Sequence, residues 1–341
     1  MAEPAISVII PTHQRREPLR RALRSLAEQT LAADSYEVAV AVDGSTDGTE
    51  EMLAGLETPY ALQVASGTRR GRAAACNAGL ELARGKIVVI LDDDMRVVPE
   101  FLEHHREHHS AGSRLCVLGA VPISIDRSSP LAARYVARKF NSHLAALAAP
   151  DHSFRPRDFY SGNASLRTEA LRAVGGFDDS FAVYGNEDVD LSLRLQAQGL
   201  ELRYDPRALA HQEYDKDLRA LARDTVHKGT TTVMLARAHP DVFHALRLAA
   251  PLENSRPWLV ARAPLLALTR RWPGFDKVAF AFAGLLERLG LWRQPLFYRA
   301  VLDYAFWSGV DTELAQSTND GELRKLAGEL HRGPIDLLLH G

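Results

Sequence analysis

The first third of the chain alternates short apolar runs with segments whose apolar residues recur at helical spacing. The apolar runs predict strands at residues 6–10, 36–42, 61–65 and 87–91, and the periodic segments predict helices at 17–29, 49–56 and 72–83. The runs lack alternation of polar and apolar residues, which is typical of strands covered on both faces. We therefore expect a parallel sheet between two helix layers, an α/β fold of the nucleotide-binding type.

From about residue 99 the rhythm changes. The pattern predicts helices at 100–110, 131–149, 189–198 and 217–238 and strands at 115–123 and 201–204, with a Gly- and Asp-rich stretch at 160–190. After Pro240 the sequence is rich in Ala, Leu and Arg and is punctuated by prolines, which predicts several short helices and no strands. The chain thus divides into an α/β domain at 1–240, with halves at 1–98 and 99–240, and a helical extension at 241–341.

Composition narrows the class of protein. Hydrophobic residues make up 46% and charged residues 25% of the 341 positions, so the chain is globular. Its formal charge of −2 provides no overall positive field, which argues against a nucleic-acid binder. Cys76 and Cys116 are too few for a disulfide scaffold, so we expect a reduced, cytoplasmic protein. The N-terminus lacks the features of a signal peptide, and no apolar stretch reaches the roughly 20 residues that cross a bilayer.

Polar residues follow three of the predicted strands. Pro11-Thr12-His13 follows the first, Asp43 the second and Asp92-Asp93-Asp94 the fourth. Ligands of an open parallel sheet bind beyond the carboxyl ends of its strands, so we expect these residues to share a site. Adjacent carboxylates repel one another unless a cation lies among them, and Mg²⁺ or Mn²⁺ suits oxygen ligands. In an extended chain Asp92 and Asp94 would face one way and Asp93 the other. A solvated acidic loop is the alternative interpretation.

A second acidic motif is Glu187-Asp188, which follows Asn186 at the start of a predicted helix. Asn186 suits an N-cap, and the helix dipole favours ionised carboxylates in the first turn. Such a carboxylate can act as a general base on a hydroxyl, whereas dipole compensation alone is the simpler alternative.

Two further motifs are weaker. Gly71 precedes Arg72 and a run of small residues that ends at Asn77, so the backbone could approach a phosphate, although a solvated basic loop fits equally well. Two i, i+4 histidine pairs could hold zinc, but no carboxylate or thiol completes the ligand set; they comprise His104, His105, His108 and His109.

Taken together and in this order, five motifs resemble those of the family 2 glycosyltransferases over about residues 5–240: Val8–Thr12, Asp43–Thr49, Leu91–Asp94, Gly175–Asp178 and Glu187-Asp188. The resemblance implies the GT-A fold, which is Rossmann-like, with a catalytic domain at 1–240. It further implies inverting, metal-dependent transfer of a sugar from a nucleotide-diphosphate donor, with UDP the expected nucleotide. The acceptor would be a hydroxyl of a glycan, a lipid-linked molecule or another small molecule.

The resemblance also implies roles for individual residues. The nucleotide and donor sugar would contact Pro11, Thr12, His13, Asp43, Arg72, Asn77, Asp92 and Asp93, with Asp43 accepting a hydrogen bond from uracil. Mn²⁺ or Mg²⁺ would be held by Asp94 with Asp92 and His211. Asp188 would be the catalytic base, with Glu187 as the alternative. The acceptor side would be shaped by Gly162, Asn163 and Gly176.

The chain departs from the family pattern at Val42, where an aspartate is frequent, and at His13-Gln14, where an aromatic residue and an asparagine are frequent. One alternative function is a nucleotidyltransferase that forms the nucleotide sugar, but this enzyme needs a Gly- and Arg/Lys-rich signature after the first strand. Another is a non-catalytic scaffold acting through the C-terminal helices, against which the intact carboxylates argue. The extension could bind acceptor, form a homodimer or contact a membrane peripherally. Phe280, Leu285 and Leu289 can be drawn near one helix face, and we expect that face to pack within the chain.

Overall fold

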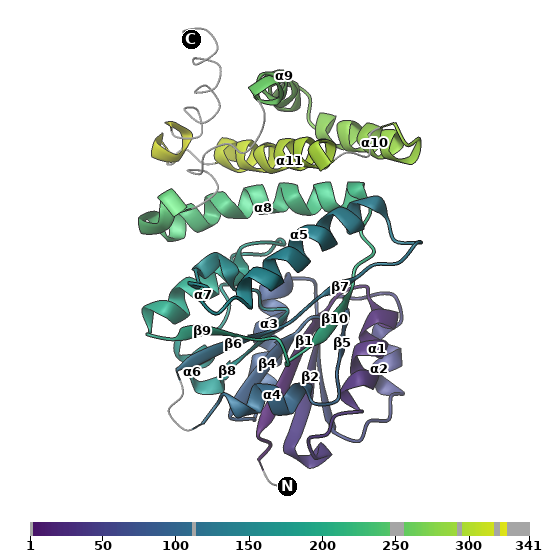
Figure 1. The fold of residues 1–341 in the computed structure, drawn as a ribbon, viewed down its shortest axis with the longest axis vertical. Coiled ribbons are helices and arrows are strands. Elements are labelled where there is room, and N and C mark those ends of the chain that lie inside the picture. Colours follow the sequence, from purple (N-terminus) through teal and green to yellow (C-terminus); the bar gives the residue numbers. More distant parts are fainter. Residues whose placement is uncertain (1–2, 111–113, 246–255, 292–294, 317–320, 326–341) are drawn as a thin grey trace. The chain divides into compact units, whose positions relative to one another are not determined.

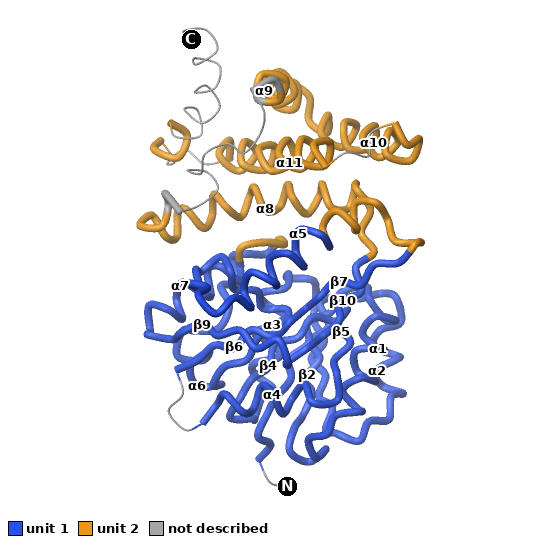
Figure 2. Tube along the Cα trace, in the orientation of Figure 1, with its two compact units in different colours: residues 1–126, 137–182, 187–214 blue, residues 127–136, 183–186, 215–341 orange. Residues whose placement is uncertain are grey.

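The computed structural model describes residues 3–110, 114–245, 256–291, 295–316 and 321–325. The chain forms two compact units (Figure 2). Unit 1 comprises residues 1–126, 137–182 and 187–214, and unit 2 comprises residues 127–136, 183–186 and 215–341. The long helix α8 (Leu218–Ala238) is therefore grouped with the C-terminal helices, whereas the sequence pattern places the domain boundary after it.

Unit 1 is built on a seven-stranded sheet with the order β3-β2-β1-β4-β8-β6-β9 (Figure 1). Its strands are β1 (Ile6–Thr12), β2 (Tyr36–Asp43), β3 (Ala61–Gly67), β4 (Ile87–Leu91), β6 (Leu115–Gly119), β8 (Asn163–Arg167) and β9 (Glu201–Asp205). Every neighbouring pair is parallel except those of β8, which runs antiparallel to both β4 and β6. The predicted α/β fold with a mainly parallel sheet is confirmed.

Both faces of β1, β2 and β4 are buried, as their unbroken apolar runs predict, whereas β3 is largely exposed. Val8 and Ile10 pack with Leu19 of α1 in one core cluster, while Ile9 packs with Cys76 of α3 in another. The helices of unit 1 are α1 (Arg16–Leu26), α2 (Thr49–Ala54), α3 (Arg72–Leu82), α4 (Phe101–Glu107), α5 (Leu131–Leu147), α6 (Thr168–Ala173) and α7 (Glu187–Ala197). The first residues of α5, up to residue 136, are grouped with unit 2. Alternate residues of one strand thus serve two helix layers, which fixes the sheet between them.

Two expectations for the second half of unit 1 are wrong. The strand expected at 115–123 is two strands, because β6 joins the large sheet while β7 (Ile123–Ser124) joins a small sheet of order β5-β10-β7. Its other strands are β5 (Met95–Val97) and β10 (Ala210–Glu213). The Gly- and Asp-rich stretch contains β8 and α6, which the pattern misses because the buried residues of β8 include Asn163 and Ser165.

Polar contacts explain why these two residues are buried. His105 has Nδ1 2.8 Å from Oγ of Ser165 and Nε2 2.9 Å from Oδ1 of Asn163. His109 has Nε2 2.7 Å from the same serine oxygen, and Nε2 of His108 lies 2.8 Å from Oδ2 of Asp205. His105, His108 and His109 therefore fasten the end of α4 to the sheet. Within the described part of the chain, no three metal-ligating side chains are gathered at one point.

Unit 2 is helical in its described residues, with α8, α9 (Arg256–Arg271), α10 (Phe275–Arg288), α11 (Pro295–Gln316) and the 3-10 turn at Pro240–Ala245. The helices are longer than the prolines suggest, since Pro264 lies inside α9 and Pro295 begins α11. Backbones of α8 and α11 meet at Gly229 and Gly309, where a Cβ atom would overlap backbone of the opposite helix. No helix among the described residues is both long enough and apolar enough to span a membrane.

The buried histidines make the stability of unit 1 depend on pH. Burial lowers the pKa of His105 to about 4 and that of His109 to about 3, below the roughly 6.5 of an unfolded chain. As the pH falls, these histidines are protonated in the unfolded chain at a higher pH than in the folded one. The free energy of unfolding therefore decreases as the pH falls from about 6.5 toward 4. Each histidine contributes a slope of up to about 1.4 kcal/mol per pH unit.

Urea unfolding between about pH 7 and 5 measures this slope, and His109→Gln should reduce it. His211→Gln, at an exposed position, is the matched control. An equal slope in the wild type and His109→Gln would contradict the prediction.

Candidate functional site

The carboxyl ends of β1, β2 and β4 bring Thr12, Asp43 and the run Asp92–Asp94 to one edge of the large sheet. After Leu91 the chain turns at Asp93 and Asp94 before β5 begins at Met95. The expected alternation, with Asp93 facing away from its two neighbours, is therefore wrong. The turn instead directs Asp93 and Asp94 to one arginine and Asp92 to another.

Arg15 lies between two of the aspartates. Its Nε is 3.0 Å from Oδ1 of Asp93, and its Nη2 is 2.9 Å from Oδ2 of Asp94. The hydroxyl of Thr12 donates to Oδ2 of Asp93 at 2.7 Å. Burial raises the pKa of Asp93 to about 7, with Asp94 and Asp92 adding to the rise and Arg15 and Thr12 opposing it. The guanidinium of Arg15 thus provides part of the positive charge that three adjacent carboxylates require.

Arg72, the first residue of α3, joins the two acidic motifs. Its Nη2 lies 2.6 Å from Oδ1 of Asp92, and its Nη1 lies 3.6 Å from Oε1 of Glu187. Nη1 also donates to Oγ of Ser161 at 2.8 Å. Burial opposes the charge of the guanidinium, but Asp92 and then Glu187 hold the pKa of Arg72 well above its ordinary value. The acid run after β4 and the start of α7 therefore form one electrostatic array.

Glu187 and Asp188 differ in their surroundings. Glu187 is only 4% exposed, whereas Asp188 is partly exposed, and its Oδ1 accepts from the backbone N–H of Val189 at 2.8 Å. The preceding Asn186 has φ of +62°, which is not the extended conformation of an N-cap. Its amide donates to hydroxyls of Thr231 and Thr232 on α8, so the predicted cap is wrong.

Asp43 holds the loop that leads into α3. Its carboxylate accepts from the backbone N–H groups of Arg70 at 2.6 Å and Gly71 at 3.0 Å. The ring Nδ1 of His13 donates to the carbonyl of Asp43 at 2.7 Å. Gly71 has φ of +99°, and a Cβ there would overlap the carbonyl of Ala182. Pro11, the penultimate residue of β1, is buried beside this group, and nucleoside contact by these residues stays a prediction.

The expected acceptor-side residues lie in two places. Gly162 borders the acid run, because a Cβ there would be 2.5 Å from Oδ2 of Asp92. Asn163 does not face an acceptor: it is fully buried, and its amide donates to the carbonyls of Ala120 and Ala208. Gly176 lies against the side chain of Asn77.

Asn77 is occupied in the same turn. Its amide donates to the carbonyl of Phe177 at 2.8 Å, and its Oδ1 accepts from the N–H of that residue at 2.8 Å. Asn77 and Gly176 therefore shape the turn after α6 and line a hollow of about 440 Å³ with Arg70, Arg172 and Asp179.

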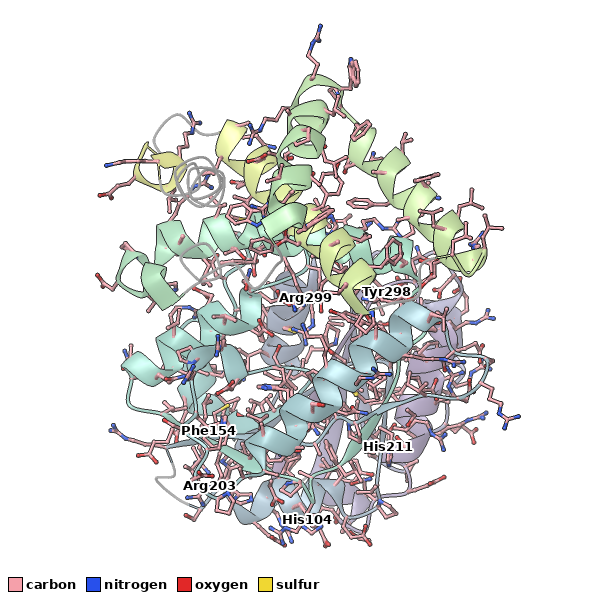
Figure 3. All side chains as sticks on the ribbon, turned by 45° about the horizontal axis from the view of Figure 1, so that its top comes forward. His104, Phe154, Arg203, His211, Tyr298 and Arg299 are labelled. Carbon is pink, nitrogen blue, oxygen red and sulfur yellow. The ribbon has the colours of Figure 1, made fainter. Side chains whose placement is uncertain are left out.

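His211, labelled in Figure 3, lies on β10 opposite Arg96 and is exposed. The neighbouring Gln212 lies opposite buried Met95, and its Nε2 is 3.5 Å from Oδ1 of Asp94. Because successive residues of a strand face opposite sides, His211 points away from the side on which Gln212 approaches Asp94. The structure therefore does not bring His211 together with Asp92 and Asp94.

The site contains three residues that sequence reasoning missed: Arg15, Ser161 and Gln212. Arg15 follows Thr12 closely, but its partners lie about 80 positions further along the chain. No local pattern reveals such a pairing. Ser161 precedes Gly162 in a stretch that the pattern left without an element.

The donor set fits a hard divalent cation. Oδ2 of Asp92 has no hydrogen-bond partner among the described residues and faces Gly162, whose lack of a side chain leaves room beside it. Carboxylate oxygens of Asp92 and Asp94 suit Mg²⁺ or Mn²⁺. The described residues do not gather three carboxylate, histidine or thiol ligands at one point. Such a cation would complete its shell with oxygens of a bound ligand or water.

Models of two known protein families match the part of the chain that contains this site. Residues 7–175 match the model of glycosyl transferase family 2, and residues 142–214 match that of the N-terminal domain of galactosyltransferase. Validoxylamine A glucosyltransferase of Streptomyces hygroscopicus is 29% identical over 225 residues, covering 58% of this chain and 53% of that protein. Pre-mycofactocin glycosyltransferase of Mycobacterium tuberculosis is 28% identical over 238 residues, covering 69% of this chain and 48% of that protein. The chain thus spans about half the length of these relatives.

Solved structures share the fold over nearly the whole chain. Mannosyltransferase PcManGT from Pyrobaculum calidifontis, in complex with GDP-Man and Mn²⁺, has a TM-score of 0.58 at 21% identity and covers 93% of this chain and 89% of its own. S. aureus TarS 1–349 in complex with UDP-GlcNAc has a TM-score of 0.51 at 18% identity and covers 92% of this chain and 93% of its own. The expected GT-A fold is confirmed.

The array around Arg72 predicts a stability difference between two arginines. Arg72→Met removes the cation shared by Asp92 and Glu187 and should lower the free energy of unfolding by about 2 to 3 kcal/mol. Arg20→Met removes a partly exposed partner of Glu17 and should cost less than about 1 kcal/mol. Urea unfolding of both variants near neutral pH checks this, and equal losses would count against a shared role for Arg72.

Proposed function

The chain belongs to glycosyltransferase family 2, and from that premise we propose that it is an inverting glycosyltransferase. It moves a sugar from a nucleotide-diphosphate donor to a hydroxyl acceptor. The observation that carries the proposal is the array in which Arg72 joins Asp92, at the end of β4, to Glu187, at the start of α7. The acid run at Asp92 would bind the departing nucleotide, and the start of α7 would act on the incoming hydroxyl.

The donor side consists of Thr12, Asp43 and the acid run. We propose that Asp43 accepts a hydrogen bond from the base and that UDP is the nucleotide. Asp92 and Asp94 would hold Mn²⁺ or Mg²⁺, which stabilises negative charge on a departing diphosphate when bound. Thr12 and Arg15 fix Asp93 beside them, so its carboxylate is oriented before the donor arrives.

The acceptor side needs a base that can reach a hydroxyl. Glu187 is buried and lies 3.6 Å from a guanidinium nitrogen of Arg72, so its charge is already engaged. Asp188 is the more exposed of the two and occupies the first turn of α7, where the helix dipole favours the ionised form. We assign the base to Asp188 and a positioning role to Glu187.

Asp188 would take the proton of the acceptor hydroxyl while the sugar–phosphate bond breaks on the opposite face of the sugar. One displacement of this kind inverts the anomeric centre. A retaining double displacement would need a nucleophile beneath that carbon, and the motifs offer no second candidate.

The substrates are proposed at the level of class. The acceptor is a glycan, a lipid-linked molecule or another small molecule, recognised by residues 120–185. The catalytic domain would extend over 1–240, with 1–98 binding nucleotide and 99–240 binding acceptor. We propose that the protein is cytoplasmic and that any contact with a membrane is peripheral. We also propose that it can form a homodimer.

The base assignment predicts a selective loss of turnover. Asp188→Asn should lower kcat for transfer by about a hundredfold to ten-thousandfold and remove the acidic limb of its pH profile, while donor affinity is kept. Glu187→Gln should keep that limb. Transfer assays across pH check this, and full transfer by Asp188→Asn would refute the assignment.

The donor site predicts metal-dependent nucleotide binding. Calorimetry should show that Mn²⁺ tightens UDP binding at least about tenfold, and that Asp94→Asn loses this gain while Asp34→Asn, at an exposed position, keeps it. A screen of nucleotide sugars for donor hydrolysis with Mn²⁺ would then identify base and sugar together. Absence of Mn²⁺-dependent UDP binding in the wild type would favour a non-catalytic scaffold, and tighter binding of another nucleotide would overturn the choice of UDP.

A further inference from the structure

Helix α10 in unit 2 exposes an apolar stripe. Val278, Phe282, Leu285 and Leu289 follow one another at intervals of four, three and four residues, which places them on one face. Their exposed fractions are 66%, 60%, 50% and 62%. The opposite face of the helix is buried, with Phe280 4% and Ala283 7% exposed. The expectation that Phe280, Leu285 and Leu289 share one face that packs within the chain is therefore wrong. Phe280 is buried, whereas Leu285 and Leu289 are exposed on the opposite face.

The stripe continues at both ends of the helix. Trp272, just before α10, is 55% exposed, and Leu291, just after it, is 63% exposed. Leu296 in the first turn of α11 is 69% exposed. Single exposed apolar side chains are ordinary, but a continuous row of this kind marks an interaction surface.

The charges beside the stripe have one sign. The exposed charged side chains of α10 are Lys277 and Arg288, and Arg271 is exposed just before the helix. Among the described residues, none of these three cations has an acidic partner within salt-bridge distance. Of the acidic residues on α10, Glu287 is buried and accepts from the hydroxyl of Tyr298 at 2.7 Å, and Asp276 is partly buried.

This combination favours one kind of partner. An amphipathic helix with large apolar residues on one face, a tryptophan at its edge and flanking Lys and Arg is suited to the boundary between lipid headgroups and acyl chains. A second copy of the chain would bring the same cations against one another across a two-fold interface, which is unfavourable. Anionic lipid headgroups provide the complementary charge.

We propose that α10 and its flanking residues bind peripherally to the surface of an anionic bilayer. Phe282, Leu285 and Leu289 enter the headgroup boundary, and Lys277 and Arg288 contact lipid phosphates. Nothing in this surface spans the bilayer. The proposal concerns unit 2 alone and does not depend on the transfer reaction proposed for unit 1.

Sedimentation of the full chain with vesicles tests this. Binding should be strong to vesicles of phosphatidylcholine mixed with phosphatidylglycerol, weaker to phosphatidylcholine alone, and reduced by salt. The double variant Phe282→Glu, Leu285→Glu should lower the affinity for anionic vesicles at least about tenfold. Val64→Glu, which changes a 43% exposed valine on β3, is the matched control and should bind as the wild type does.

Lys277→Glu with Arg288→Glu should abolish the preference for anionic over neutral vesicles. Circular dichroism and thermal unfolding should show that each variant folds as the wild type does, since all the changed side chains are exposed. Equal vesicle binding by the double variant and Val64→Glu, or no binding by the wild type, would overturn the proposal. So would a wild-type dimer in light scattering that Leu285→Glu converts to a monomer, because a second copy would then cover the stripe.

Discussion

Mutual repulsion of carboxylates constrains the edge of the sheet at which β1, β2 and β4 end. Three aspartates follow β4 directly, and a glutamate from α7 approaches the same region. Arg15 and Arg72 make this arrangement compatible with a folded chain, because each guanidinium contacts two acidic groups. The elements that carry these arginines, the loop before α1 and the start of α3, are thereby tied to β4 and α7. Fold and site therefore depend on the same charges.

The two carboxylate oxygens of Asp92 have different surroundings. Oδ1 of Asp92 is bound by Arg72, while Oδ2 faces the space above Gly162. One oxygen thus anchors the side chain and the other stays available to a ligand. Glu187 is likewise anchored by Arg72.

The sequence could predict the parts of this molecule that follow from local pattern. The apolar runs located β1, β2 and β4, and their polar ends located the acid run and Asp43. The antiparallel strand β8 escaped prediction because Asn163 and Ser165 are buried by hydrogen bonding, and hydropathy registers only apolar burial. Arg15 escaped because its partners are distant in sequence. His211 was misplaced because the two-residue period of β10 brings Gln212 to Asp94, and register cannot be read from composition.

The histidine contacts of β8 have a consequence for how this chain can vary. His105 accepts from the hydroxyl of Ser165 and donates to Asn163, whose amide is committed to two carbonyl groups. His105, Asn163 and Ser165 are all buried, so each depends on hydrogen bonds within the protein. A substitution at one of these three positions leaves buried polar atoms of the other two without a hydrogen-bond partner. We therefore expect the three positions to change together. Divergence among related chains should therefore replace the set as a block, and any chain that keeps the histidine should keep the asparagine with it.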